Sequence, residues 1–346
     1  MEDMSKQLLD RRELGGLCAA LGSSLPAVSA MLTGLSGASA FAAATGTDSN
    51  VAGRMVKFRG GTVVPALGQG SGGLGQGRHP AAVEEEALRT GLSLGMTLID
   101  TSEGYGNGRS EELIGRAIAG QRDRVFLVSK VDHMTADGII ARACEESLAR
   151  LGTDHLDLYL AHWRDRSTDL SVVVAAFESL RTAGKIRAWG VSNFNVNEME
   201  ELFNIPQGDR CATNQVYYNL GGRGIERDLL PWCERHNMPV MAYSPLGGPG
   251  ASLLADPILG RIAAAHACSA AAVALAWTIR NGNVIAIPES GSVAHVKENA
   301  VALSLDLTPQ ELQTLDAAHP PPDLYQRVFR QLKQGLGAAA RRFGLY

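Results

Sequence analysis

The sequence lacks any excess of basic charge. Among its 346 residues, 32 are Lys or Arg and 36 are Asp or Glu, which gives a formal net charge of −4 at pH 7. A protein that binds nucleic acid or an anionic membrane through its overall charge carries a basic surplus instead. We therefore expect no nucleic-acid partner and no membrane insertion of the folded part. The composition, 45% hydrophobic and 20% charged, is that of a soluble globular protein.

Closely spaced cysteine pairs are also missing. The five cysteines stand at positions 18, 144, 211, 233 and 268. This spacing fits neither a disulfide framework nor a metal site, so we expect neither. Cys144, Cys233 and Cys268 fall in stretches with helical character, where a buried and unreactive thiol is the expected state.

Charged residues are absent from Leu14 to Thr47, where Ala, Gly, Ser and Leu dominate. Arg11-Arg12 stands just before this run, and the small residues Ala38-Ser39-Ala40 lie near its end. A basic pair, a mildly apolar stretch and a small-residue site together indicate an export signal, and the paired arginines resemble the twin-arginine (Tat) type. Residues 1–50 are therefore predicted to direct the protein to the periplasm through the Tat export machinery.

Some features of this segment depart from that pattern. Asp10 and Glu13 stand beside the arginine pair, and Pro26 with the repeated glycines disfavours a membrane-spanning helix. A disordered extension of a cytoplasmic protein is the alternative. A start codon assigned too early is another, since Met55 opens the first strand-like segment.

Short apolar runs recur after residue 55, and a segment with helical spacing follows each one. Because the runs are apolar on both faces, they predict buried strands of a parallel sheet. "MVKFRGGTVV" precedes them and predicts a hairpin with Gly60-Gly61 at its turn. The eight runs are "PALGQGS" (65–71), "TLID" (97–100), "VFLVSKV" (125–131), "LDLYLAH" (156–162), "IRAWGVSN" (186–193), "ATNQVYY" (212–218), "PVMAYSP" (239–245) and "VIAIPES" (284–290).

Eight strand–helix units in about 250 residues match a closed (β/α)8 TIM barrel. The sequence thus predicts an N-terminal β-hairpin, a barrel within residues 55–320 and extra C-terminal helices, with an open doubly wound sheet as the alternative. Thr308, Pro309 and Glu311 supply the N-cap, first-turn proline and capping-box glutamate of a ninth helix. Residues 321–346 form a basic, helix-capable tail, to which the pattern assigns no task.

The segment from Gly68 to Gly73 matches the G-x-G-x-x-G pattern of dinucleotide-binding turns and favours the doubly wound alternative. A lone match in a glycine-rich stretch is weak evidence. The next helix is expected only near Pro80, and the nearest acidic residue that ends a strand, Asp100, lies further along than such a fold requires. We therefore interpret the segment as the first strand and its loop.

Polar residues follow three successive predicted strands. Asp100 ends the second strand, Tyr105 lies in the loop beyond it, Lys130 ends the third strand and His162 ends the fourth. In a (β/α)8 barrel the carboxyl ends of the strands converge on one mouth. Each residue alone has an ordinary explanation as a cap, a rim charge or a packed histidine, but together they predict an active site.

These residue types suit proton transfer to a carbonyl oxygen. A lysine ammonium favours the phenolate of a nearby tyrosine and so lowers its pKa, while Asp100 keeps Lys130 charged and in place. A neutral His162 can orient a carbonyl oxygen by hydrogen bonding. Tyr105 would then act as the general acid that protonates the carbonyl as hydride arrives.

With this tetrad the chain resembles the aldo-keto reductase family over essentially all of residues 55 to 320. Further segments are similar to the family's last four strands. The details "LYLAHW" and "GGRGIERDLLPWC" are most similar to bacterial members that reduce methylglyoxal or small aldehydes. The four matching segments are "GKIRAWGVSNF" (184–194), "NQVYYN" (214–219), "AYSPLG" (242–247) and "AIPES…HVKEN" (286–299).

The resemblance implies a nicotinamide cofactor, NADPH in most members, held without a dinucleotide-binding turn. Ser192, Asn193 and Gln215 would hold the carboxamide, and Tyr243 would stack on the nicotinamide ring. The remaining implied contacts are Ser244, Pro245 and Leu246 over the pyrophosphate, Ser290 at the adenosine ribose, and Asn299 at the adenine.

Glu289 departs from the family pattern, because relatives usually carry a lysine there that meets the 2′-phosphate of NADPH. A carboxylate repels that phosphate and can accept hydrogen bonds from free ribose hydroxyls. His295 stands where many relatives have a second cation. We therefore expect NADH to be used as well, with relaxed or NADH-leaning preference.

The resemblance thus implies an enzyme that reduces aldehydes or ketones to alcohols, with a small carbonyl compound as substrate. Trp163, next to His162, is expected to line the substrate pocket, with ordinary packing as the alternative. Two other functions stay open. One is a cofactor-binding regulatory or sensor barrel with little turnover, and the other is a different barrel enzyme, such as a phosphate-binding lyase or isomerase.

Overall fold

A computed structural model describes residues 54–132, 138–164, 168–248 and 252–322. The predicted export segment, residues 1–50, lies outside this described part, as does the tail from residue 323 onward. Within the described residues, no single helix is long and apolar enough to cross a membrane. Two neighbouring helices, Pro257–Ala265 and Ala270–Thr278, meet that test only as a pair bent by 95°.

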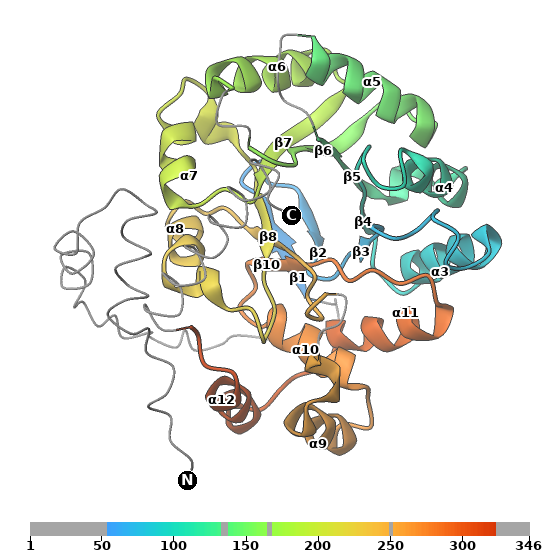
Figure 1. Cartoon of the computed structure of the whole chain (residues 1–346), viewed down its shortest axis with the longest axis vertical. Coiled ribbons are helices and arrows are strands. Elements are labelled where there is room, and N and C mark those ends of the chain that lie inside the picture. Colours follow the sequence, from blue (N-terminus) through green and yellow to red (C-terminus); the bar gives the residue numbers. More distant parts are fainter. Residues whose placement is uncertain (1–53, 133–137, 165–167, 249–251, 323–346) are drawn as a thin grey trace, which may run out of the picture. The chain divides into compact units, whose positions relative to one another are not determined.

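Eight parallel strands form the centre of the described chain, and helices surround them (Figure 1). Neighbours along the chain are neighbours in the sheet, from β3 to β10 in order. The two outer strands also meet, because the Gly68 amide donates to the Ala286 carbonyl oxygen at 2.8 Å. The strands are β3 Gln69–Gly70, β4 Leu98–Asp100, β5 Phe126–Val131, β6 Leu156–Ala161, β7 Ile186–Ser192, β8 Asn214–Tyr217, β9 Val240–Tyr243 and β10 Val284–Ala286. The predicted (β/α)8 barrel is confirmed.

The helices follow the strands as predicted, except after β9, where two helices replace the single one expected. Asp256 caps the first of them with Pro257 in its first turn, and Ser269 caps the second. The helices are α3 Ala81–Ser93, α4 Arg109–Ile118, α5 Ile139–Leu151, α6 Leu170–Thr182, α7 Val196–Phe203, α8 Leu229–Arg235, α9 Pro257–Ala265, α10 Ala270–Thr278, α11 Val293–Ala300 and α12 Pro309–Ala318. Short 3-10 turns are η2 Arg122–Arg124, η3 Gly208–Arg210, η4 Gly224–Arg227, η5 Leu253–Ala255 and η6 Val301–Leu303.

The glycines of the G-x-G-x-x-G match close the barrel and open no helix. A Cβ at Gly68 would lie 2.7 Å from the Leu98 side chain, and one at Gly70 would lie 2.7 Å from the Ile287 carbonyl oxygen. Only a residue without a Cβ lets β3 approach both neighbouring strands this closely. The interpretation of the segment as the first strand and its loop is confirmed.

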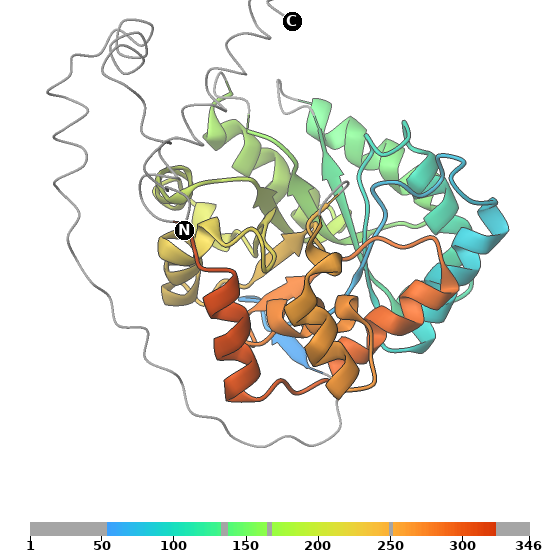
Figure 2. The ribbon, with the colours of Figure 1, turned by 60° about the horizontal axis from the view of Figure 1, so that its bottom comes forward.

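The predicted hairpin consists of β1 Met55–Lys57 and β2 Val63–Pro65, paired antiparallel. Phe58 stacks on Phe126, the first residue of β5, with ring centroids 5.4 Å apart. The hairpin therefore covers the amino-terminal end of the barrel (Figures 1 and 2). The carboxyl ends of the strands, where the predicted site residues lie, are left open on the opposite side.

Aromatic packing between the sheet and its helices fixes the outer layer. Phe177 of α6 lies between Tyr159 of β6 and Trp189 of β7, with ring centroids 5.8 Å and 5.5 Å away. All three side chains are buried, and each contributes about 1.5–3 kcal/mol relative to an exposed position. This packing holds β6 and β7 at the register that places His162 and Asn193 at the mouth.

Candidate active site

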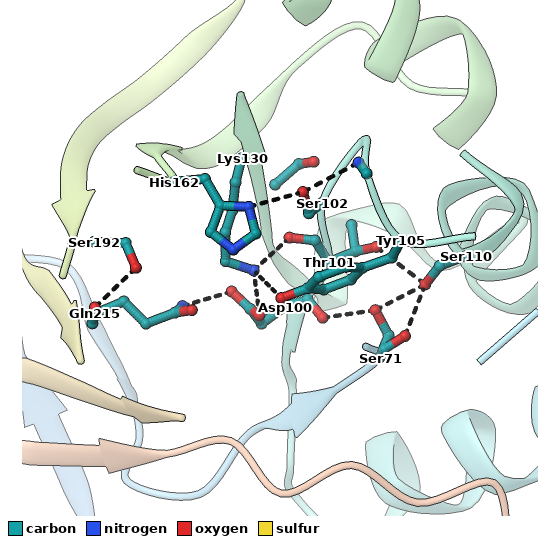
Figure 3. A network of polar contacts seen from close by, with 12 residues as sticks. Ser71, Asp100, Thr101, Ser102, Tyr105, Ser110, Lys130, His162, Ser192 and Gln215 are labelled. Carbon is teal, nitrogen blue, oxygen red and sulfur yellow. Dashed lines mark hydrogen bonds and ion pairs between the residues drawn. The ribbon is translucent and has the colours of Figure 1, made fainter. Parts of the chain in front are cut away.

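Lys130 lies at the centre of the mouth and is fully buried. Its Nζ donates to Asp100 Oδ1 at 2.6 Å, to the Thr101 carbonyl oxygen at 2.7 Å and to the Tyr105 hydroxyl at 3.2 Å (Figure 3). Burial lowers the pKa of the ammonium, but the Asp100 carboxylate and the Tyr105 hydroxyl outweigh it and raise that pKa above its ordinary value. Lys130 is therefore charged, although no part of it reaches solvent.

Tyr105 reaches Lys130 from the loop between β4 and α4. Gly106 and Gly108 adopt positive φ angles of 61° and 84°, so this loop turns sharply before the helix begins. Burial raises the pKa of the Tyr105 phenol above its ordinary value and outweighs Lys130, which lowers it. The expectation of a lowered pKa is therefore wrong, because the cost of burying a phenolate exceeds the gain from the neighbouring ammonium. Tyr105 holds its proton across the neutral range.

A chain of hydroxyl groups fixes the base of this loop. Ser110, the second residue of α4, donates from Oγ to Ser71 Oγ at 2.8 Å, and Ser71 Oγ donates to the Asp100 carbonyl oxygen at 2.9 Å (Figure 3). All of these residues are buried. This network was not predicted, and it joins the ends of β3 and β4 to α4 beneath Tyr105.

Gln215 connects the tetrad to the far wall of the barrel. Its side-chain Nε2 donates to the second oxygen of Asp100 at 2.7 Å, and its backbone carbonyl oxygen accepts from Ser192 Oγ at 2.9 Å. Both residues are 2% exposed or less. Asp100 thus has one oxygen on Lys130 and the other on Gln215, which prevents the carboxylate from rotating.

Asn193 and Ser244 are non-glycine residues with positive φ angles, of 64° and 49°. Such conformations cost about 1–3 kcal/mol and gather at binding sites. The Asn193 side chain accepts from the Tyr243 hydroxyl at 3.0 Å and donates to Ser192 Oγ at 3.0 Å. Tyr243 and Asn193, two predicted cofactor contacts, therefore hold one another in place.

His162 follows β6, and its backbone amide donates to the Val131 carbonyl oxygen at 3.0 Å. Its ring meets the Tyr105 ring edge-on at 5.9 Å and stacks on the exposed Trp163 ring at 5.4 Å. Its Nδ1 is hydrogen-bonded to Asp132. Asp132 was not among the predicted site residues, although it follows β5 directly and the same strand-end rule applies to it.

These residues surround a cavity of about 700 Å³. Lys130 and Ser192 are absent from its lining and lie behind the wall, where they position the residues that do face it. The predicted residues on the wall are Asp100, Tyr105, His162, Trp163, Asn193, Gln215, Tyr243, Ser244, Pro245, Leu246 and Glu289.

A second cavity of about 300 Å³ adjoins the first, and Arg78 and Glu289 line both. Arg78 Nη1 donates to Glu289 Oε1 at 3.1 Å, so the carboxylate that departs from the family pattern has a cationic partner from the β3–α3 loop. This pair was not predicted, because Arg78 and Glu289 lie far apart in the sequence and come together only where the first and last barrel strands meet. Ser290 and His295 line the second cavity, whereas the buried Asn299 lines neither.

Comparisons with known proteins agree with this geometry. The sequence profile of the aldo/keto reductase family matches residues 66–320. The chain is 50% identical to methylglyoxal reductase YeaE of Escherichia coli strain K12 over 273 residues, which cover 78% of this chain and 96% of that protein.

More distant relatives and solved structures give the same result. An aldo-keto reductase of Mycobacterium sp. strain JLS is 34% identical, over 78% of this chain and 96% of its own length. A crystal structure of an aldo/keto reductase from Klebsiella pneumoniae in complex with NADP and acetate superposes with a TM-score of 0.76 at 45% identity, covering 79% of this chain and 97% of that one. A second structure, of the aldo-keto reductase from that organism in complex with NADPH, gives the same values.

Proposed function

We propose a reaction for this chain from one premise: it belongs to the aldo/keto reductase family. It is an NAD(P)H-dependent oxidoreductase that reduces aldehydes or ketones to alcohols. One contact supports this function above all: the Tyr105 hydroxyl accepts from the buried Lys130 ammonium. Tyr105 and His162 lie side by side on the wall of a single cavity. The sensor-barrel alternative requires no such proton donor.

Each residue of the tetrad has a separate task. Tyr105 donates its proton to the carbonyl oxygen, and Lys130 stabilises the phenolate that remains. Asp100 keeps Lys130 charged and is itself held by Gln215. His162 hydrogen-bonds the carbonyl oxygen and so orients the substrate toward Tyr105. Water then restores the Tyr105 proton.

The cavity walls fit a nicotinamide dinucleotide. The two cavities share Arg78 and Glu289, so an elongated ligand has room to extend from the tetrad toward Ser290 and His295. Asn193, Gln215 and Tyr243 would hold the nicotinamide end, with Ser192 positioning them from behind, and Ser244, Pro245 and Leu246 would cover the pyrophosphate. When bound, the reduced nicotinamide supplies the hydride. Asn299 would act at the adenine end, from beneath the cavity wall.

The substrate that we propose is a small aldehyde, with 2-oxoaldehydes such as methylglyoxal as the first candidates. The relative from Escherichia coli is a methylglyoxal reductase, and the 50% identity extends over 78% of this chain and 96% of that protein. Trp163 is 54% exposed above His162 and would form the outer wall of the substrate site.

The test is a screen of small aldehydes and ketones with the full-length protein, following NADPH oxidation. Tyr105→Phe is expected to lower kcat by about 10²–10⁴-fold, because the general acid is lost. Cofactor affinity should stay within about twofold of the wild type, since the Asn193, Gln215 and Tyr243 contacts remain. Equal turnover in the two proteins would refute the assignment of Tyr105. A wild type that binds NADPH but reduces nothing in the screen would favour the sensor barrel.

NADPH is the cofactor that the Klebsiella structures support, and we propose that this chain accepts NADH as well. The Arg78–Glu289 pair is charge-neutral, so it neither attracts nor repels a 2′-phosphate strongly. Its side chains are 60% and 31% exposed, and such pairs contribute only about 0–1 kcal/mol, so they open easily. Arg78 can then turn to a phosphate, while Glu289 accepts from a ribose hydroxyl.

Titration of the full-length protein with each cofactor, followed by fluorescence quenching, tests this preference. The wild type is expected to bind NADPH and NADH within about tenfold of each other, a difference of about 1.4 kcal/mol. Glu289→Lys should strengthen NADPH binding and leave NADH binding nearly unchanged. The control Glu200→Lys makes the same charge change on α7, away from both cavities. A wild type that discriminates strongly against NADH would contradict the proposal.

We further propose that residues 1–50 export the protein by the twin-arginine route, as the sequence analysis predicts. That route carries folded proteins, so the cofactor would travel bound. An exported enzyme would need a periplasmic source of reduced cofactor for repeated turnover. The supporting features remain the Arg11-Arg12 pair and the uncharged run that follows it.

A further inference from the structure

The turn beside the cofactor cavity is held by a residue to which the reaction described above gives no task. Ser244, Pro245 and Leu246 line the cavity, and the turn ends at Gly247, whose amide donates to the Ser244 carbonyl oxygen at 2.9 Å. The same carbonyl oxygen accepts from Asn219 Nδ2 at 3.0 Å. Asn219 comes from the segment after β8, so it ties this turn to the neighbouring strand.

The local sequence explains the turn only in part. Pro245 at its second position and Gly247 at its fourth are residues that β-turns favour. Ser244, however, has a positive φ angle of 49°. A residue before proline is normally extended, and only glycine takes a positive φ without strain. Contacts from outside the turn must therefore hold Ser244 in this conformation.

Asn219 is well placed to hold Ser244. It is fully buried, and it begins a tight turn in which the Gly222 amide donates to its carbonyl oxygen at 2.9 Å. Two residues earlier, Tyr217 ends β8 and pairs with Tyr243, which directly precedes Ser244. The register of β8 and β9 therefore brings the Asn219 side chain to the Ser244 carbonyl group.

A second contact holds the other end of the turn. The Tyr217 hydroxyl donates to the Gly247 carbonyl oxygen at 3.4 Å. A Cβ at Gly222 would lie 2.4 Å from Tyr217 Cε1 and 3.2 Å from Asn219 Nδ2. Gly222 does not adopt a positive φ angle, so the space for these two side chains is what favours a glycine there.

The orientation of the Asn219 amide follows from its partner. A carbonyl oxygen can only accept, so the amide nitrogen must face Ser244. The other atom, Oδ1, is buried and has no hydrogen-bond partner among the described residues. A buried acceptor without a partner destabilises the folded chain, which offsets what the Nδ2 hydrogen bond contributes. Stability alone therefore does not explain an asparagine here, whereas control of the turn does.

We propose that Asn219 is a positioning residue for cofactor binding. It fixes the Ser244–Gly247 turn in the conformation that receives the pyrophosphate of the nicotinamide dinucleotide. This inference rests on the cofactor site proposed above and deepens it. Without the Asn219 contact, Ser244 relaxes toward an extended conformation, and the turn leaves its place on the cavity wall for part of the time. The apparent affinity for the cofactor then falls in proportion to the fraction of molecules whose turn is in place.

Isothermal titration calorimetry of the full-length protein with NADPH, without a carbonyl substrate, tests this proposal. Asn219→Ala is expected to raise the Kd about 10-fold, equivalent to about 1.4 kcal/mol, because the turn is no longer held. The control Asn204→Ala truncates an exposed asparagine after α7 that lines neither cavity, and it should leave the Kd unchanged. An Asn219→Ala protein that binds NADPH as tightly as the control would overturn the proposal and leave the carbonyl reduction itself untouched.

Two further measurements separate positioning from a merely structural role. Urea denaturation without cofactor should give the same midpoint for Asn219→Ala as for Asn204→Ala, because the unpaired Oδ1 is removed together with the hydrogen bond. The KM for NADPH should rise about 10-fold, whereas kcat at saturating NADPH should not fall, because the tetrad is unchanged. A lower urea midpoint together with a lower kcat at saturation would mean that Asn219 serves only the structure, and would overturn the proposal.

A second variant covers the case in which Asn219→Ala does not fold. Gly222→Ala keeps Asn219 but places a methyl group against Asn219 Nδ2 and the Tyr217 ring, which is 40% exposed and can move outward. It is expected to raise the Kd for NADPH as well. The control is Gly224→Ala, where no atom lies within 4 Å of the added methyl and φ is not positive. Equal NADPH affinities of these two variants would overturn the proposal.

Discussion

Loss of Lys130 is expected to destabilise the folded protein as well as the site. Lys130→Met leaves the Asp100 carboxylate buried without its cation, which costs about 3–5 kcal/mol in the free energy of unfolding. Urea denaturation measures this loss, with Lys57→Met on the exposed face of β1 as the control. A Lys130→Met protein as stable as the control would show that Gln215 alone satisfies Asp100.

The strand-end rule predicted Asp100, Lys130 and His162 because each lies at a carboxyl end, which a parallel barrel brings to one mouth. Asp132 also follows a strand, but its role depends on a contact with His162 that spacing does not reveal. Arg78 could not be predicted, since its partner Glu289 lies on the last strand's loop. The direction of the Tyr105 pKa shift could not be predicted from the sequence either, because it depends on how deeply the phenol is buried.

Among the elements, β3 has no room for a side chain at Gly70. Gly70→Ala would place a Cβ 2.7 Å from the Ile287 carbonyl oxygen, and neither backbone can move without opening the barrel. Overpacking of this kind costs about 1–3 kcal/mol.

Chemical denaturation of Gly70→Ala is expected to show that loss. The matched control is Gly60→Ala, in the turn of the hairpin, where no atom lies within 4 Å of the added methyl and φ is not positive. The control should change stability by less than about 1 kcal/mol. Equal effects of the two substitutions would show that β3 and β10 separate without cost.

Strand positions were predictable from continuous apolar runs, whereas the division between α9 and α10 was not. The break falls at Ala267, which adopts a positive φ of 51°, a conformation that alanine disfavours and that its sequence does not signal. Cys268 lies in this turn, half-buried and outside both helices, so its predicted helical position is wrong. The caps of α12 at Thr308 and Glu311 were predictable because capping is local.

For the whole molecule, ion pairs predict how stability changes with pH. Burial raises the pKa of the Glu178 carboxyl, but Arg181, Trp189 and Arg210 outweigh it and lower the pKa below its ordinary value. Asp132 shifts in the same direction. A carboxyl with a lowered folded-state pKa adds stability above its unfolded pKa of about 4, and this stability is lost as pH falls. The Lys130 pKa is raised, so its contribution is present below about 10.4 and is lost at higher pH.

Urea denaturation from pH 3 upward is therefore expected to show a stability plateau from about pH 5 to about pH 10, with losses on both sides. Glu178→Gln should lower the plateau by on the order of 1 kcal/mol and flatten the acid side, because the charged partner of Arg181 and Arg210 is gone. An acid side as steep in Glu178→Gln as in the wild type would exclude Glu178 as a cause.

The export proposal also belongs to the whole molecule. Replacing Arg11 and Arg12 by lysine keeps the charge but removes the twin-arginine pair, and should retain the protein in the cytoplasm. Cell fractionation and sequencing of the mature N-terminus measure this, with Arg59→Lys in the hairpin as the control. A wild type found only in the cytoplasm with its first residues intact would contradict export.

The contact between β3 and β10 has a consequence for the order of events during synthesis. The cavity is walled by residues from the first strand to the last, and the Gly68–Ala286 hydrogen bond joins segments from opposite ends of the described chain. Contacts this distant in sequence form late in folding. A ribosome-bound chain that lacks β10 has neither the hydrogen bond between Gly68 and Ala286 nor Glu289. The wall of its cofactor cavity is therefore incomplete. Binding of the nicotinamide dinucleotide therefore reports that the last strand is in place.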